Sequence, residues 1–390
     1  MGAVSLLVAL ALSADHGYAT TSLQAEARAA APLVGGLPAG LTPELSIRPS
    51  LDAGYVAGVL RATAGYQLQI TATSANFTAP GFLHRAQAGV EWRLSAGRRV
   101  LVDQALTFGQ YDTSLGNLGA GGAPLPVLLP LVTVDYLTSN TALGLDGSIA
   151  PRLRLRTTLG YNASGGLTDA ARAQIPLQQG PRLTVELEHM ATRRDALSGS
   201  LRLSADRFTG GRADGRTAAI AEGTASWRII VTRETGLRLS GGAAGVVSVA
   251  AGDAPAPQVA PVASANFTYG VPRVRLGLDA AYSPQADALS GAIFQRAGVG
   301  VSGEYRPTSQ YTARAAFGGS WAVENLTLGD RTVLGEASLG WREHPVEISA
   351  GLRVANAQVT LPGDPLPTTA TEARAFVSFS LTARPGPGAR

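Results

Sequence analysis

Residues 152–162 read RLRLRTTLGYN, and polar and apolar residues alternate along them. In an extended strand, successive side chains point to opposite faces. One face would carry Leu153, Leu155, Leu159 and Tyr161. The other face would carry arginines. A helix would scatter these three arginines and three leucines around its cylinder without an apolar stripe. The stretch therefore predicts a β-strand with one face for an apolar medium and one for water.

The same alternation recurs along the chain from residue 44 to residue 381. The connections between the alternating segments also alternate in length. Short turns are predicted near residues 97, 151, 193, 234, 272, 308 and 344, and longer Gly-, Pro- and Asp-rich loops lie between them. Short turns on one side and long loops on the other are typical of outer-membrane β-barrels.

Aromatic residues lie close to the short turns: Trp92, Trp227, Tyr269, Tyr305, Tyr311 and Trp341. Barrels carry girdles of such amphipathic rings at the membrane interface. A soluble β-sandwich or solenoid is the alternative, because its strands also alternate. The girdle and the rhythm of the connections favour the barrel.

The cost of a misplaced arginine fixes which face points inward. About a dozen arginines share the polar faces, and each would cost roughly 2–4 kcal/mol if it pointed into lipid at mid-depth. The sum exceeds a typical net stability of about 5–15 kcal/mol. About 16 strands fit between Val59 and Leu381, and residues 44–55 could add another. We therefore predict an all-β, membrane-spanning, antiparallel up-and-down β-barrel of 16 or 18 strands with a water-filled lumen.

Over residues 44–382 the chain resembles the Gram-negative outer-membrane β-barrels, through its hairpin rhythm, girdles and closing amphipathic strand. It departs from them at its end, where Phe379 and Leu381 are followed by the tail RPGPGAR instead of a final aromatic residue. The resemblance implies location in the bacterial outer membrane, contact with outer-membrane lipid, and insertion by the barrel-assembly machinery.

The domain boundaries follow from composition. Residues 1–19 are predicted to be a signal peptide, because residues 3–12 are apolar or small and Gly17-Tyr18-Ala19 suits cleavage. A short buried helix is the alternative. Residues 20–43 are predicted to be a periplasmic lead-in, residues 44–383 the barrel, and residues 384–390 a tail. No later apolar run reaches the roughly 18 residues expected of a transmembrane helix.

Composition and motifs exclude several function classes. All 32 Lys and Arg residues are arginines and there is no cysteine, which excludes a P-loop lysine, a Schiff base, disulfides and thiolate metal sites. The arginines are spread evenly, which argues against nucleic acid as a partner. Residues 298–303 match a dinucleotide-binding pattern, but no helix is predicted after them. We predict no enzyme activity, no cofactor and no metal.

The predicted pore lining is the charged face of the strands. Its members are Arg61, Glu91, Arg93, Asp103, Arg154, Arg156, Glu186, Glu188, Arg202, Arg228, Arg238, Arg275, Glu304, Arg314, Arg353 and Arg374, with Asp206, Asp279, Glu336 and Glu347. Rings of charge in a pore bias which solutes pass, so a slight basic excess predicts a weak preference for anions. The alternative is an ion-pair lattice that only stiffens the wall.

These residues predict a channel for polar or anionic solutes, in one version a porin that exports a secreted polysaccharide with periplasmic export proteins. The alternative is a structural or adhesive barrel with a blocked lumen, whose extracellular loops bind a partner. A lipid enzyme built on His189 is a third hypothesis, because His189 and Gln104 are polar residues on the apolar set. The apolar loop of residues 111–130 could fold into the pore or cap it. The sequence does not specify the cargo or the oligomeric state.

Overall fold

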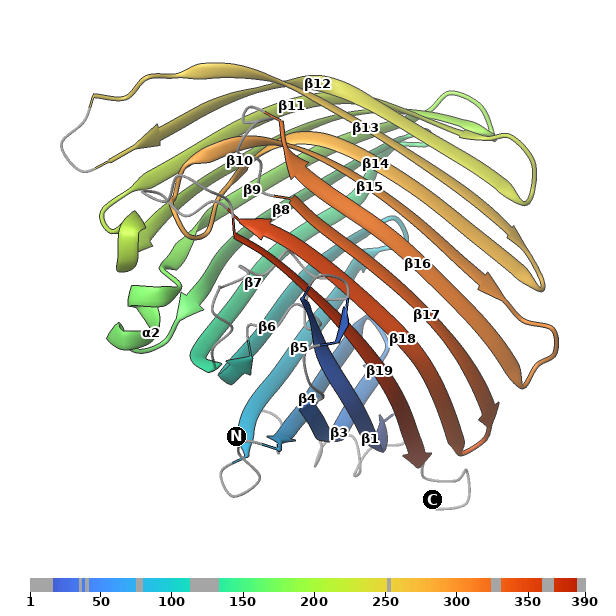
Figure 1. Cartoon of the computed structure of the whole chain (residues 1–390). Coiled ribbons are helices and arrows are strands. Elements are labelled where there is room, and N and C mark those ends of the chain that lie inside the picture. The colour runs from blue at the N-terminus through green and yellow to red at the C-terminus, as the bar shows by residue number, and fades with distance from the viewer. Residues whose placement is uncertain are drawn as a thin grey trace.

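The computed structural model describes residues 17–34, 37–38, 42–74, 80–112, 133–250, 254–323, 331–359 and 368–383. Within these ranges the chain forms one antiparallel sheet that closes on itself as a barrel (Figure 1). The strands are β1 (Gly17–Val34), β2 (Leu37–Pro38), β3 (Thr42–Ala57), β4 (Leu60–Thr73), β5 (Gly81–Ser95), β6 (Arg98–Asp112), β7 (Thr133–Ala150), β8 (Leu153–Gly166), β9 (Leu177–Met190), β10 (Asp195–Thr209), β11 (Thr217–Ile230), β12 (Thr235–Val249), β13 (Gln258–Val271), β14 (Val274–Ala286), β15 (Ile293–Tyr305), β16 (Tyr311–Ala322), β17 (Arg331–Glu343), β18 (Val346–Val359) and β19 (Thr368–Ala383).

Eighteen of these strands build the wall, because the two-residue β2 pairs only with the end of β1. From β3 onward each wall strand pairs with the next one in sequence, and β1 lies between β3 and β19, which closes the barrel. The predicted up-and-down barrel is confirmed, with the larger of the two predicted strand numbers. Sixteen strands run from β4 to β19, and β1 and β3 make up the eighteen.

The predicted lead-in at residues 20–43 is corrected by the structure. Residues 17–34 form β1, whose register runs from Thr21 opposite Ala383 to Pro32 opposite Glu372. The segment is rich in alanine, a residue depleted in strands, and therefore reads as a linker. It forms a strand because the edges of β3 and β19 would otherwise leave their backbone groups unpaired in lipid. The predicted signal peptide lies almost wholly outside the described residues, as do the tail and most of the 111–130 loop.

The connections confirm the predicted rhythm. All the predicted short turns join strands at the end of the barrel that also holds Gly17 and Ala383, and a further short turn at residues 58–59 joins β3 to β4. At the opposite end lie α2 (Asp169–Gln174) and the 3-10 turn η2 (Gly211–Ala213). In bacterial barrels the short turns are periplasmic and the long loops extracellular. None of the described helices is long and apolar enough to span a membrane.

Large apolar side chains lie exposed along one face of the sheet. Examples are Leu143, Leu159, Phe317, Leu339 and Leu352, which are between 51% and 69% exposed. A soluble protein rarely leaves so large an apolar surface in water. The predicted girdle residues Trp92, Tyr305 and Tyr311 are also exposed, near the short-turn end. The chain is therefore an outer-membrane barrel and not a soluble sandwich.

Candidate functional site

Several of the predicted charged residues lie directly opposite a residue of the other sign on the neighbouring strand. Arg61 lies opposite Glu91 on β4 and β5. Arg154 and Arg156 of β8 lie opposite Glu188 and Glu186 of β9. Glu304 of β15 lies between Arg275 of β14 and Arg314 of β16. Because every second residue of a strand shares a face, this register collects the charges on the face opposite the exposed leucines.

Asp146 on β7, which sequence reasoning missed, organises a chain of ion pairs that crosses β6, β7, β8 and β9. One of its carboxylate oxygens, Oδ2, lies 2.8 Å from Arg99 Nη2, 2.5 Å from Arg154 Nη2 and 4.0 Å from Arg156 Nη2. Arg156 continues the chain to Glu186, with 3.5 Å between Nη1 and Oε2. Asp146 follows a long run with few charges, so only the position of β7 between β6 and β8 reveals its role.

Two further ion pairs skip whole strands. Arg228 of β11 reaches Glu188 of β9, with 3.2 Å between Nη2 and Oε1. Arg238 of β12 reaches Glu186 of β9 at the same distance. Three strand spacings measure about 14 Å along a sheet, and side chains can bridge them only where they converge. Side chains converge on the concave side of a curved wall, so these contacts favour the inside of the barrel for the charged face.

Acids and bases are unequally exposed along this face. The side chains of Asp146, Glu186 and Glu304 are 1%, 19% and 17% exposed, because they lie close to the wall. Several arginines extend past them, and the side chains of Arg93, Arg202 and Arg275 are 63–69% exposed. An arginine can lay its stem along a surface and leave its guanidinium in water. On this face the guanidinium groups therefore extend farther from the wall than the carboxylates, and we call them the guanidinium layer. The numbers of positive and negative charges on the face are close to balance.

A second set of charges is buried where the barrel closes. It comprises Glu26, Arg28, Glu44, Arg48, Glu372 and Arg374, on β1, β3 and β19, with side chains no more than 17% exposed. Arg28 Nη1 lies 3.1 Å from Glu44 Oε1, and Arg48 Nη1 lies 3.4 Å from Glu26 Oε2. Arg374, a predicted pore residue, belongs to this closure cluster and is much less exposed than the arginines of β5, β10 and β14. Glu26 and Arg28 lie within the predicted lead-in at residues 20–43, so the sequence does not place them on the wall.

Some of the other predicted residues form an ion pair and some do not. Arg353 pairs with Glu336 at 2.5 Å, and Arg202 with Glu222 of β11 at 3.8 Å. Arg61 and Asp103 form no ion pair with any other residue that the structure describes. Serine hydroxyls fill much of the space between the charges, as in the 2.6 Å contacts Ser198–Ser226 and Ser240–Ser264.

The two polar residues on the apolar face have ordinary surroundings. His189 lies between Leu153 and Leu197, and neither leucine could supply a nucleophile or an acid. Gln104 donates to Ser139 at 3.1 Å and accepts from Thr141, so neighbouring hydroxyls satisfy its amide. Within the described ranges no group of three or more His, Asp or Glu residues could hold a metal ion.

Replacing Asp146 with alanine is expected to lower the free energy of unfolding by about 1–3 kcal/mol. Breaking a buried ion pair costs about 3–5 kcal/mol, but its arginine partners are roughly half exposed, so water offsets part of that loss. Urea unfolding in lipid vesicles measures the change. Asp214→Ala, at the extracellular end, is the matched control. Equal stability of the two variants would contradict the role given to Asp146.

Comparison with known proteins supports an outer-membrane transport protein. The sequence model of the EpsX exopolysaccharide export family matches residues 104–359, from within β6 to the end of β18. The FrpB iron transporter from Neisseria meningitidis (F3-3 variant) superposes with a TM-score of 0.51 and 7% identity, over 97% of this chain and 83% of that one. The siderophore receptor PirA from Pseudomonas aeruginosa superposes with a TM-score of 0.50 and 10% identity, over 95% and 81%. At these identities the two structures show the fold alone. A search of curated protein sequences finds no match.

Proposed function

This chain belongs to the EpsX exopolysaccharide export family, and we propose that its barrel is the outer-membrane channel through which a secreted polysaccharide leaves the cell. The polymer would enter from the periplasm, so periplasmic export proteins are the proposed partners. Outer-membrane lipid and the barrel-assembly machinery are the other proposed partners, as for barrels of this class.

The guanidinium layer is the observation that carries this proposal. Barrels of 16 to 18 strands leave an aqueous channel that side chains alone do not fill. We propose that the charged face lines this channel, as predicted for Arg61, Glu91, Arg93, Asp103, Arg154, Arg156, Glu186, Glu188, Arg202, Arg228, Arg238, Arg275, Glu304, Arg314 and Arg353. Arg374, within the closure cluster, would hold the wall together and touch the cargo little.

The chemistry of this face suits a hydrated polymer. Each guanidinium offers five N–H donors and each serine hydroxyl both donates and accepts, so hydroxyl-rich sugars could exchange hydrogen bonds with wall and water alike. Carboxylates on the polymer would add charge-assisted bonds to arginine. The small side chains between the charges, such as Ser198, Ser226, Ser240 and Ser264, leave the path wide.

Conductance in planar lipid bilayers tests the channel, and polysaccharide fractionation tests the cargo. The purified barrel is expected to produce discrete conductance steps with a preference for anions. Cells that lack the protein are expected to retain the polysaccharide inside the outer membrane, and the wild-type chain should restore its release. A folded barrel that conducts no ions would instead support the blocked, adhesive alternative. Conductance with undisturbed polysaccharide release would leave a channel for other polar solutes.

A further inference from the structure

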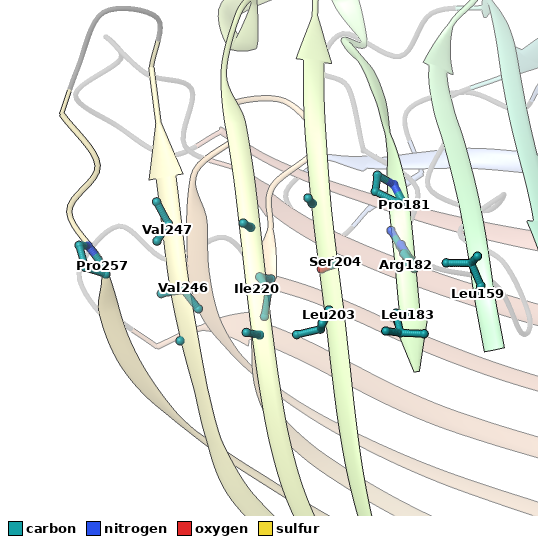
Figure 2. Close-up of a pocket in the computed structure, with 14 residues that line it drawn as sticks. Leu159, Pro181, Arg182, Leu183, Leu203, Ser204, Ile220, Val246, Val247 and Pro257 are labelled. Atoms are coloured by element: carbon teal, nitrogen blue, oxygen red, sulfur yellow. The ribbon is translucent and has the colours of Figure 1, made fainter. Parts of the chain in front are cut away.

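A groove interrupts the apolar outer face of the barrel on β8 to β12 (Figure 2). Its volume is about 490 Å³. Leu159, Leu183 and Leu203 border it on one side and Val247 on the other, and Ala219 and Ala221 lie between them. Gly245 also lines the groove, and a Cβ atom added to it would have no other atom within 4 Å. We call this site the outer-wall groove.

The strand register places the groove on the outside of the wall. Leu183, Leu203, Ala221 and Gly245 form one continuous row across β9 to β12. This row has the parity of the exposed leucines, and so do several of the other lining residues. Arg182, Ser204, Ile220 and Val246 have the opposite parity and border the groove as well, whereas Arg202 and Glu222 do not. Hydrocarbon is therefore the medium that this groove faces.

The groove lies near the extracellular end of the wall. Ala219 is two residues from the start of β11, and Val247 is two residues from the end of β12. Tyr161 of β8 and Pro181 of β9 are neighbours in the same row. An aromatic girdle is expected at this depth, but small side chains continue the row beyond Pro181. The row continues with Ala205, Ala219 and Val247, so this part of the outer wall has a gap where a girdle residue is expected.

A row of polar residues lies next to this gap, on its extracellular side. Arg207 of β10 is opposite Gln179 of β9 and Thr217 of β11, with the same parity as the groove lining. Arg207 is exposed and forms no ion pair with any residue in the part of the chain that the structure describes. It is two residues beyond Ala205, which lines the groove, so its Cα lies about 7 Å farther toward the extracellular side.

We propose that the outer-wall groove binds one phosphorylated lipid of the outer leaflet, with an acyl chain in the groove and a phosphate on Arg207. The apolar lining suits hydrocarbon, and a guanidinium is the side chain best suited to phosphate. Arg207 lies on the extracellular side of the groove, just as the phosphate of such a lipid lies on the extracellular side of its acyl chains. The bound lipid would complete the girdle where the sequence leaves it open.

Native mass spectrometry of the full chain in detergent tests the site, with purified lipid A and its phosphate-free form as probes. Arg207→Gln is expected to reduce retention of lipid A about tenfold, as for the loss of one charge-assisted hydrogen bond, and to leave the phosphate-free form unchanged. Gly245→Leu fills the groove without a clash and should reduce retention of both forms.

Two matched variants serve as controls. Gly199→Leu adds the same side chain on the outer face of β10, where an added Cβ is equally unobstructed. Arg193→Gln removes an arginine from the short turn at the other end of the β9–β10 hairpin. Equal retention by Gly245→Leu and Gly199→Leu would overturn the proposal. So would dissociation of an oligomer by Gly245→Leu with lipid retention unchanged, because the groove would then be a contact between copies of the chain. Lipid retention is measured without any transport, so the outcome of this test does not depend on the export proposal.

Discussion

Replacing Arg93, Arg202 and Arg275 together with glutamate is expected to reverse the proposed anion preference of the channel to a cation preference. These side chains are among the most exposed of the guanidinium layer and pair with Glu91, Glu222 and Glu304 at 3.5–3.9 Å. The triple substitution changes the charge of that layer by six elementary charges, and the charge of a pore wall biases which ions pass. The sign of the reversal potential in a KCl gradient across a planar bilayer measures the effect.

A milder triple variant and a matched control separate lumen charge from folding. The same three arginines replaced by glutamine should remove the anion preference without reversing it, and no new like-charge contacts arise. Arg193, Arg233 and Arg273 lie in short turns, and their replacement by glutamate makes the same change of charge away from the wall. An unaltered reversal potential in the folded glutamine variant would mean that the guanidinium layer does not face the path of the ions.

Leu352→Arg is expected to lower the free energy of unfolding by about 2–4 kcal/mol, the cost of an arginine that faces lipid at mid-depth. Leu352 lies at the centre of β18 and is 62% exposed on the outer face. Chemical unfolding of the barrel in lipid vesicles measures the loss.

Ser349→Arg, three residues away on the opposite face of β18, is the control. Its new guanidinium would lie in water near Glu347, so we expect little change in stability. Equal tolerance of the two arginines would mean that the wall has no lipid-facing side at Leu352, and the assignment of the faces would then be wrong.

The sequence by itself determined the architecture, because the pattern of a barrel strand can be recognised within the residues of that strand alone. The alternation in residues 152–162 depends only on the two-residue period of an extended chain, and short turns such as that near residue 344 are visible as breaks in it. The penalty for arginine in lipid then assigns the faces. These local signals were enough for a membrane barrel of 16 or 18 strands and for most of the charged face.

Tertiary structure alone decided how the strands meet. Alanine-rich β1 became part of the wall because two open edges needed a partner, which no local pattern reveals. The bridge from Arg238 to Glu186 depends on the curvature of the wall, and the burial of Asp146 below three arginines depends on register. The outer-wall groove exists because small residues from β11 and β12 fall side by side. Such features depend on how several strands align with one another, and the period of a single strand contains no information about its neighbours.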